Sequence, residues 1–336
     1  MRITGKRVLV TGGAGFIGSH LVEDLVQDND VTVLDDFSVG SERNLASVRS
    51  SMRIVAADVT DGDSLIEAAA GAQVIFHLAV SCLRISIPDP MRSHLVNDLG
   101  TLNLLLAARS SRALERFVYV SSSEIYGNST DGPIAEDHPP RPTTPYGASK
   151  LAGEAYSLSF MRTYGLPVSV VRPFNAYGPR SHLEGPSGEV IPKFVARAMA
   201  GLPLVIFGDG AQTRDYTWVK DTVRGIRTAA ECDALVGDWI NIAHGEAVRI
   251  DRLAQLVQEV LGTHVPLQHL PERPGDVRHQ QADVSRSQML LNFSATVGIE
   301  DGLRRYVDWV QAQPGEPRSW LLHEEVQNWK EEPLAI

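Results

Sequence analysis

A glycine-rich turn near the amino terminus limits the possible folds of this chain more than any other feature. The apolar run at residues 8–10 leads into the spacing G-x-x-G-x-x-G, formed by Gly12, Gly15 and Gly18, and a helix-like stretch follows at once. Glycines let the backbone turn tightly and approach a pyrophosphate, and the free N–H groups of the following helix face its negative charge. The strand, the glycine turn and the helix therefore predict a dinucleotide-binding unit.

Two acids stand where such a unit holds the ribose of its dinucleotide. The second apolar run, Val31–Leu34, ends in Asp35 and Asp36, about 20 residues after the glycine turn, which is the expected spacing. A carboxylate at this position binds the ribose hydroxyls and repels a 2′-phosphate. The sequence therefore predicts NAD, rather than NADP, as the cofactor.

Strand-like and helix-like stretches alternate through the first half of the chain, as in a parallel sheet covered by helices on both faces. Beyond Pro173 the pattern becomes less regular. We predict an α/β fold, a Rossmann-type doubly wound parallel sheet with a smaller C-terminal α+β substrate-binding lobe. The NAD-binding domain should comprise residues 1–173 together with 215–243, and the lobe residues 174–214 and 244–336. The predicted strands are Val8–Thr11, Val31–Leu34, Met52–Ala56, Val74–Leu78, Phe117–Ser121 and Val168–Arg172, and the predicted helices include Ser19–Gln27, Ser64–Ala70, Met91–Arg109, Tyr146–Thr163, Pro192–Ala200, Asp251–Leu261 and Glu300–Gln311.

Composition and charge argue against several classes of function. The 336 residues carry a net charge of −10 with scattered acids, whereas a nucleic-acid partner would require a basic face. No apolar stretch approaches the roughly 18 residues of a membrane span, and the first strand begins too early to leave room for a signal peptide. Cys82 and Cys232 are too few for a disulfide framework or a zinc site. We expect a cytoplasmic protein without a metal, a membrane partner or a nucleic-acid partner.

A tyrosine and a lysine form the core of a candidate catalytic group. Tyr146 and Lys150 are four residues apart in a predicted helix, so they share one face. A tyrosine has a pKa near 10, but a nearby ammonium, together with the positive nicotinamide ring, favours the phenolate. The serines at positions 121–123 follow the fifth predicted strand, at the edge where an open α/β sheet binds its ligand. They can hydrogen-bond a sugar hydroxyl and the tyrosine oxygen, or simply cap the next turn.

These residues together resemble the extended short-chain dehydrogenases/reductases of the nucleotide-sugar epimerase/dehydratase family. The resemblance covers nearly the whole chain and implies an NAD-dependent enzyme. The segments that carry it are Thr11–Gly18, Asp35, Asp58–Val59, His77–Ala79, Asn97, Ser121–Gly127, Tyr146–Lys150, Arg172–Arg180, Gly208–Asp221 and Arg273–Asp283.

The resemblance also implies which residues bind the cofactor. The glycine turn would line the pyrophosphate, Asp58 and Val59 would flank the adenine, and residues 78–80 would pass under the cofactor with Asn97 behind it. The cofactor-binding residues implied in this way are Gly12, Gly15, Phe16, Ile17, Gly18, Asp35, Asp36, Asp58, Val59, Leu78, Ala79, Val80, Asn97, Ser121, Tyr146, Lys150 and Pro173.

By the same resemblance, Tyr146 would be the base, Lys150 its partner and Ser122 the catalytic serine, with Ser123 and Glu124 completing the catalytic set. Two arginines would reach the nucleotide diphosphate, because a planar guanidinium forks onto phosphate oxygens; for one of them, at position 278, a structural salt bridge is the alternative. The implied substrate-binding residues are Arg84, Ser122, Ser123, Tyr146, Asn175, Arg180, Val190, Ile191, Lys193, Phe194, Phe207, Arg214 and Arg278.

Family members share a first step that gives a 4-keto sugar, and they differ in the later steps. An epimerase turns the keto sugar and returns hydride to the other face, a dehydratase also needs an extra acid and base, and a decarboxylase loses CO₂. Ser123 stands where dehydratases of the dTDP-glucose type carry an aspartate, which counts against that type, whereas Glu124 is compatible with all three reactions. The loop around Arg84 resembles the Val-Arg-Tyr-Ser-Ile loop of glucuronate 4-epimerases.

We therefore expect an NAD-dependent nucleotide-sugar 4-epimerase that acts on a UDP-hexose or UDP-hexuronate with tightly bound NAD. The alternatives are a UDP-glucuronate decarboxylase, an NDP-hexose 4,6-dehydratase, or a non-catalytic sensor or scaffold that binds NAD and a nucleotide.

Two predicted helices carry more apolar surface than one face of a sheet requires. In 91–109, Leu99 and Leu106 belong to one stripe, while Leu104 and Leu105 belong to another. Two stripes indicate two partners, and the resemblance implies a homodimer in which these helices pair with their copies; the alternative is that the C-terminal lobe covers the second stripe. The tail, with its tryptophans among many charges, is a further candidate for a docked amphipathic helix.

Overall fold

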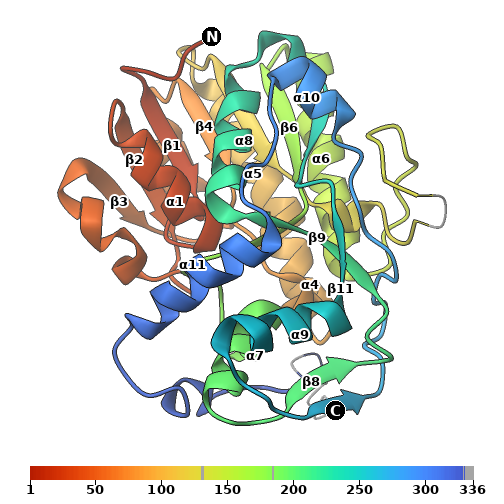
Figure 1. Ribbon diagram of the computed structural model, residues 1–336. Helices are drawn as coiled ribbons and strands as arrows, with labels where there is room; N and C mark the ends of the chain where they lie inside the picture. Colours follow the sequence, from red (N-terminus) through yellow and green to blue (C-terminus); the bar gives the residue numbers. More distant parts are fainter. Residues whose placement is uncertain (130–131, 184, 328, 330–336) are drawn as a thin grey trace, which may run out of the picture.

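A seven-stranded parallel sheet forms the centre of the computed structural model, which describes residues 1–129, 132–183, 185–327 and 329 (Figure 1). The strand order is β10-β6-β5-β4-β1-β2-β3. The order reverses between β1 and β4, and such a switch point leaves a ligand crevice at the carboxyl ends of the strands. This topology confirms the predicted Rossmann-type fold. The strands are β1 Arg7–Thr11, β2 Asp30–Asp35, β3 Met52–Ala56, β4 Val74–His77, β5 Arg116–Val120, β6 Val168–Pro173 and β10 Trp239–Ile242.

Helices cover both faces of this sheet. Helices α1 (Phe16–Leu25) and α8 (Val219–Glu231) pack together on one face, and α2 (Gly62–Ala69), α5 (Gly100–Ser110) and α6 (Pro145–Tyr164) cover the other. Every residue of β5 is buried, as expected for a parallel strand between two helical layers. The sequence located α1, α2, α5 and α6 to within a few residues, because their apolar periodicity reports the buried face directly. It did not predict α8.

The predicted helix 91–109 is one continuous helix with an irregular centre. It runs from α4 (Pro90–Ser93) through a π-helical segment, η2 (His94–Leu99), into α5. Single π-helical turns inside α-helices often occur at functional sites, and this one contains the buried Asn97. No pattern in the sequence indicated this irregularity or the short helix α3 (Leu83–Ser86).

Most of the remaining elements form a smaller unit beside the carboxyl ends of the large sheet (Figure 1). It has its own hydrophobic core, drawn from the small sheets and from α7, α9 and α11. Helix α10 lies in the stretch predicted for the lobe, but it packs against β10 of the large sheet. Its elements are β7 Asn175–Tyr177, β9 Thr213–Trp218 and β11 Ala247–Arg249 in one sheet, β8 Leu204–Phe207 and β12 Leu267–Leu270 in another, and helices α7 Val190–Met199, α9 Ile250–Leu261 and α11 Ile299–Gln311. The other elements are α10 Ser285–Leu291 and the 3₁₀ turns η1 Glu42–Ser51, η3 Ser123–Ile125, η4 Gly185–Ser187, η5 Asp233–Leu235 and η6 Ser319–Leu321; of these turns, η1, η3 and η5 contact α1, α6 and α8 of the large unit.

The two apolar stripes of α5 meet different surroundings. Leu104 and Leu105 are fully buried against the sheet, whereas Leu99 and Leu106 are 36% and 48% exposed. The smaller unit therefore does not cover these two leucines within one chain, and pairing with a second copy stays a prediction.

Two further features concern possible partners. Among the helices of the described residues, none is both long and apolar enough to cross a membrane. Within the same part of the chain, no group of histidine, cysteine, aspartate and glutamate residues is arranged to hold a metal ion.

Candidate active site

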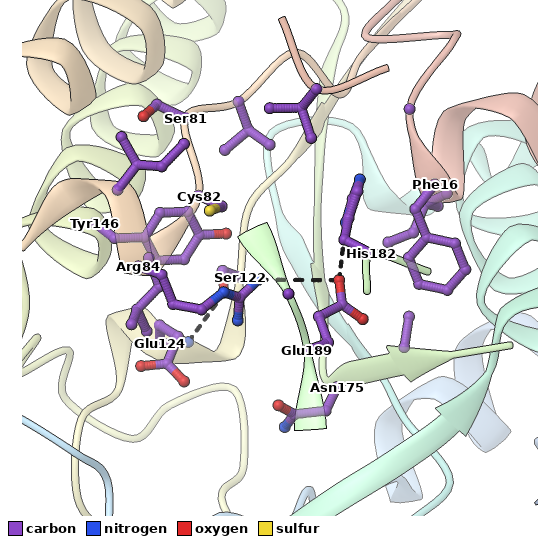
Figure 2. A pocket seen from close by; sticks show the side chains of 18 of the residues that line it. Phe16, Ser81, Cys82, Arg84, Ser122, Glu124, Tyr146, Asn175, His182 and Glu189 are labelled. Atoms are coloured by element: carbon purple, nitrogen blue, oxygen red, sulfur yellow. Dashed lines mark hydrogen bonds and ion pairs between the residues drawn. The ribbon is translucent and has the colours of Figure 1, made fainter. Parts of the chain in front are cut away.

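A cavity of about 620 Å³ opens at the carboxyl ends of the parallel strands and extends to α7 and β8. It joins the glycine turn, the serines after β5 and the start of α6 to the smaller unit. All of the predicted cofactor-binding residues line it except Asn97, and so do the predicted catalytic residues. Figure 2 shows Tyr146, Ser122 and Arg84 on one side of this cavity, with His182 and Glu189 across from them.

The glycine turn has the shape that a pyrophosphate site requires. Gly12 has a φ of +69°, and a Cβ there would lie 2.6 Å from the backbone nitrogen of Ala79. A Cβ on Gly18 would lie 2.1 Å from the carbonyl oxygen of Gly12, so α1 packs directly on the turn. Gly15 is the N-cap of α1 and no side chain caps this helix, which leaves its positive end available to an anion. The turn therefore fits a dinucleotide.

Three carboxylates and one arginine surround the predicted ribose and adenine positions. Asp35 accepts hydrogen bonds from the backbone N–H groups of Ala14, at 2.8 Å, and Phe37, at 2.9 Å, and burial raises its pKa. Arg92 bridges Asp36 and Asp58, with N–O distances of 3.2 and 3.1 Å. Asp35 thus also holds the glycine turn, and Arg92 brings a cation close to the predicted ribose site.

Two buried serine hydroxyl groups in the cavity have no hydrogen-bond partner among the described residues. They belong to Ser81 and Ser121, which are 5% and 4% exposed. A buried polar group without a partner costs free energy, so a polar ligand in the cavity would stabilise both. This is a second way in which the cavity fits a dinucleotide.

Asn97 lies behind the cavity and fixes the loop that follows β4. Its amide oxygen accepts from the Ser81 N–H at 2.7 Å, and its amide nitrogen donates to the Ser81 carbonyl at 3.0 Å. The same nitrogen donates to the hydroxyl groups of Ser93 and Ser149, at 3.1 and 2.9 Å. Since Ser149 stands on α6 between Tyr146 and Lys150, one side chain couples the loop under the predicted cofactor site to the catalytic helix.

The start of α6 is defined by its capping residues. The Thr144 hydroxyl accepts from the N–H of Gly147 at 3.2 Å, and Pro145 occupies the first helical turn, where proline is favoured. The helix ends at Gly165, whose φ is +71°. Tyr146 and Lys150 therefore lie in the first turns, beside the ends of the strands.

Ser122 and Tyr146 both line the cavity, and the Ser122 hydroxyl accepts a hydrogen bond from the N–H of Glu124 at 3.2 Å. Burial raises the pKa of the tyrosine to about 12, and Glu124 and Cys82 act in the same direction, whereas Ser122 and Arg84 lower it. In the protein alone the phenol is thus protonated at neutral pH. The lowering of the pKa that we expected at this tyrosine requires positive charge in addition to that of Arg84.

Lys150 is 2% exposed, and burial lowers its pKa to about 7. Its ammonium group lies 4.4 Å from the centre of the Tyr119 ring. Because the ammonium and the neutral amine are close in free energy near pH 7, this side chain can change its protonation state in response to a nearby charge.

Across the cavity from Tyr146 lie Glu189 and His182, which the sequence did not single out. Glu189 lies 3.1 Å from Nδ1 of His182 and 4.0 Å from the Arg84 guanidinium (Figure 2). Arg84 donates to the Ser187 carbonyl at 2.9 Å, and its buried Nε has no partner among the described residues. These groups make this part of the cavity polar.

Of the arginines at positions 180, 214, 273 and 278, two line the cavity and two do not. Arg214 and Arg273 line it, and both pair with Asp276, the former at 2.6 Å. Arg278 instead pairs with Asp209 at 2.5 Å with its side chain 41% exposed, as the structural alternative predicted. Arg180 pairs with Glu23 of α1 at 2.5 Å. The structure therefore does not bring these last two to the cavity.

The other predicted substrate-binding residues line the cavity: Arg84, Ser122, Ser123, Tyr146, Asn175, Val190, Ile191, Lys193, Phe194, Phe207 and Arg214. The lining residues that sequence reasoning missed include Ser81, Arg92, His182, Glu189, Arg273 and Trp329. Arg273 begins a segment that resembles the family, which was a usable signal. No local pattern marked the others, because they reach the cavity through long-range packing.

Comparisons with known proteins agree with this geometry. The NAD dependent epimerase/dehydratase family matches residues 8–243. A UDP-glucose 4-epimerase of Mycolicibacterium smegmatis is 36% identical over 309 residues, which cover 90% of this chain and 98% of the relative. Among solved structures, a UDP-N-acetylglucosamine 4-epimerase from Methanobrevibacter ruminantium has a TM-score of 0.87 at 35% identity, covering 94% of this chain and 100% of that one. A dTDP-glucose 4,6-dehydratase from Streptomyces venezuelae, with NAD bound, has a TM-score of 0.87 at 32% identity, covering 94% and 98%.

Proposed function

This chain belongs to the NAD-dependent epimerase/dehydratase family, and we propose that it is a 4-epimerase of UDP-hexoses or UDP-hexuronates. The family and the fold make it an NAD-dependent enzyme. The names of the similar proteins support a UDP-sugar 4-epimerase, since the relative from Mycolicibacterium smegmatis and the structure from Methanobrevibacter ruminantium are both epimerases of this kind.

The observation that carries the proposal is that one cavity holds the glycine turn, the Ser122–Tyr146 pair and Lys150. NAD⁺, when bound, supplies the acceptor and later the donor of the C4 hydride. Tyr146 receives the proton of the sugar 4-hydroxyl at its phenol oxygen and returns it after the keto sugar has turned. Ser122, which lines the cavity with the tyrosine, orients that hydroxyl with its own.

Lys150 matters because the protein alone disfavours the phenolate. Burial holds the pKa of Tyr146 at about 12, so the proton can leave only when positive charge accumulates nearby. An ammonium with a pKa of about 7 supplies this charge in its protonated form, and a positively charged nicotinamide ring adds to it. We therefore expect turnover to depend on both groups.

Position 123 favours epimerisation over dehydration. Ser123 lines the cavity and is 3% exposed, and a hydroxyl cannot serve as the extra general acid that a 4,6-dehydratase needs to expel the sugar 6-hydroxyl. Glu124 also lines the cavity and is the candidate C5 base in the dehydratase alternative.

Replacing Tyr146 by phenylalanine tests the proposal. The variant should keep its fold and its NAD but lose turnover by about 10²-fold or more, since it has no group to take the proton. Tyr164→Phe is the matched control, because Tyr164 is the last residue of the same helix and is 49% exposed. Products from a panel of nucleotide sugars are read by mass and proton NMR. Unchanged mass indicates epimerisation, and activity of Tyr146→Phe within a few-fold of the parent would remove this tyrosine from the mechanism.

Glu124→Gln separates the proposed reaction from dehydration. Epimerisation at C4 should continue at a measurable rate, because it needs no base at C5. A dehydratase would accumulate NADH without releasing a sugar product. That second pattern would favour the dehydratase alternative.

A further inference from the structure

The carboxyl-terminal tail docks on the elements that form one end of the cavity. After α11 the chain makes a single 3₁₀ turn, η6, so the predicted amphipathic helix is absent from the described part of the tail, and η6 lies against α7. The residues that follow, 323–327 and 329, are here called the tail segment. Three of them, Glu324, Val326 and Trp329, line the same cavity as Tyr146.

Polar contacts tie the tail segment to α7 and to the turn before it. Glu324 pairs with Arg197 at 2.7 Å, and the two side chains are only 8% and 11% exposed. Lys193 donates to the carbonyl oxygen of Glu325 at 2.6 Å, and the Gly185 N–H donates to the carbonyl oxygen of His323 at 3.1 Å. A shielded ion pair with two further hydrogen bonds is a specific docking arrangement, unlike the exposed pairs that contribute little to stability.

An aromatic contact completes the docking. The ring centres of Trp329 and Phe207 are 4.5 Å apart at an interplanar angle of 80°, and Trp329 is 9% exposed. Phe207 ends β8 and lines the cavity together with Phe194 of α7. The cavity end formed by α7 and β8 is thus walled by aromatic rings from three separate segments of the chain, which is the surface that a flat heterocycle prefers.

We propose that the tail segment is part of the substrate site, where Trp329, with Phe207 and Phe194, encloses the nucleobase of the nucleotide sugar. This inference rests on the proposed function for the identity of the ligand. Val190–Phe194, the stretch that the family resemblance assigns to the base, belongs to α7, the helix on which the tail segment docks.

The epimerisation reaction explains why the nucleobase, rather than the sugar, would be enclosed. The keto sugar must turn over between the two hydride transfers, so contacts to the sugar ring cannot hold the intermediate throughout. The nucleotide end has to supply the binding energy that keeps it in the cavity. A tail segment that encloses the base would do this without restricting the sugar.

Trp329→Ala tests the proposal, with Trp320→Ala as the matched control. Both tryptophans belong to the tail, but Trp320 packs on the core of the smaller unit and does not line the cavity. Loss of a ring beside a base should raise KM and weaken binding of free UDP by about tenfold, with a smaller effect on kcat. Glu324→Gln should also raise KM and weaken UDP binding, because it releases the tail segment from Arg197. Trp329→Phe should restore most of the affinity.

Two readouts distinguish this role from a merely structural one. Titration calorimetry with UDP, dTDP and GDP measures the nucleotide contact without any reaction, while NAD affinity should stay unchanged in every variant. Faster escape of the keto sugar from Trp329→Ala should leave the removed hydride on the cofactor, so NADH absorbance should rise during turnover.

Equal nucleotide affinity of Trp329→Ala and Trp320→Ala would overturn the inference, as would failure of the parent protein to bind any of the three nucleotides. If the parent binds a nucleotide but epimerises no UDP-sugar, the proposed function fails while the binding comparison still decides the role of the tail.

Discussion

Replacing Gly18 by alanine tests whether the glycine turn depends on a backbone contact that only glycine permits. The added Cβ would lie 2.1 Å from the carbonyl oxygen of Gly12 and 2.9 Å from the Cα of Gly13, whereas ordinary contact begins at 3.4 Å. The turn and α1 must therefore separate by roughly 1 Å. Overpacking of this kind costs about 1–3 kcal/mol of folding free energy.

The same displacement should weaken NAD binding. The N-terminus of α1 would move away from the pyrophosphate, and one hydrogen bond to a charged group is worth about 1.5–3 kcal/mol. Losing one such bond corresponds to roughly ten- to a hundredfold lower affinity, because each 1.4 kcal/mol is tenfold. Urea unfolding and calorimetric titration with NAD measure the two effects separately.

Gly62→Ala is the control for this experiment. Gly62 begins α2, and a Cβ there would meet no atom within 4 Å. Alanine at this position should keep the NAD affinity of the parent and raise the stability by up to about 1 kcal/mol. A Gly18→Ala protein with parental stability and parental NAD affinity would refute the reasoning about the turn.

Three further predictions concern acid stability, cofactor choice and assembly. Burial lowers the pKa of His77 from 6.5 to about 3, so the unfolded state binds a proton more strongly than the folded state does. Folding stability should therefore fall as the pH drops from 6.5 towards 3, by at most about 5 kcal/mol. In urea titrations His77→Gln should show a shallower fall over that range, and an unchanged slope would contradict the assignment. The protein should bind NAD far better than NADP in calorimetry. Asp35→Ala should weaken NAD binding, because it removes both the predicted ribose ligand and the partner of the Ala14 N–H. Equal affinity for the two cofactors would contradict the selection of NAD by Asp35 and would indicate that Arg92, which pairs with Asp36, accommodates the 2′-phosphate of NADP. Light scattering at low micromolar concentration should give twice the chain mass of 36.7 kDa, since Leu99 and Leu106 are exposed on α5; a fully active monomer would exclude the predicted helix pairing.

Local sequence determined the parts of this protein that depend on short-range geometry. The glycine turn could be read directly because a positive φ at Gly12 and the close approach of Gly18 restrict those positions to one residue type. The face shared by Tyr146 and Lys150 follows from the helical repeat, and Thr144 with Pro145 marks the start of that helix. Alternation of apolar strands and helices predicted the doubly wound sheet, because burial on both faces leaves a strong periodic signal, but it did not predict the edge strand β10.

Tertiary structure alone decided which charged groups face the ligand. Arg273 and Arg278 are alike in sequence, yet Asp276 holds one at the cavity and Asp209 holds the other outside. The pKa of Tyr146 depends on burial by several elements, which no spacing of residues encodes. Trp329 reaches Phe207 across more than a hundred residues, and such a contact exists only once the smaller unit has packed. Short-range rules specify backbone turns and helix faces, whereas electrostatics and ligand walls arise from the sum of distant packing contacts.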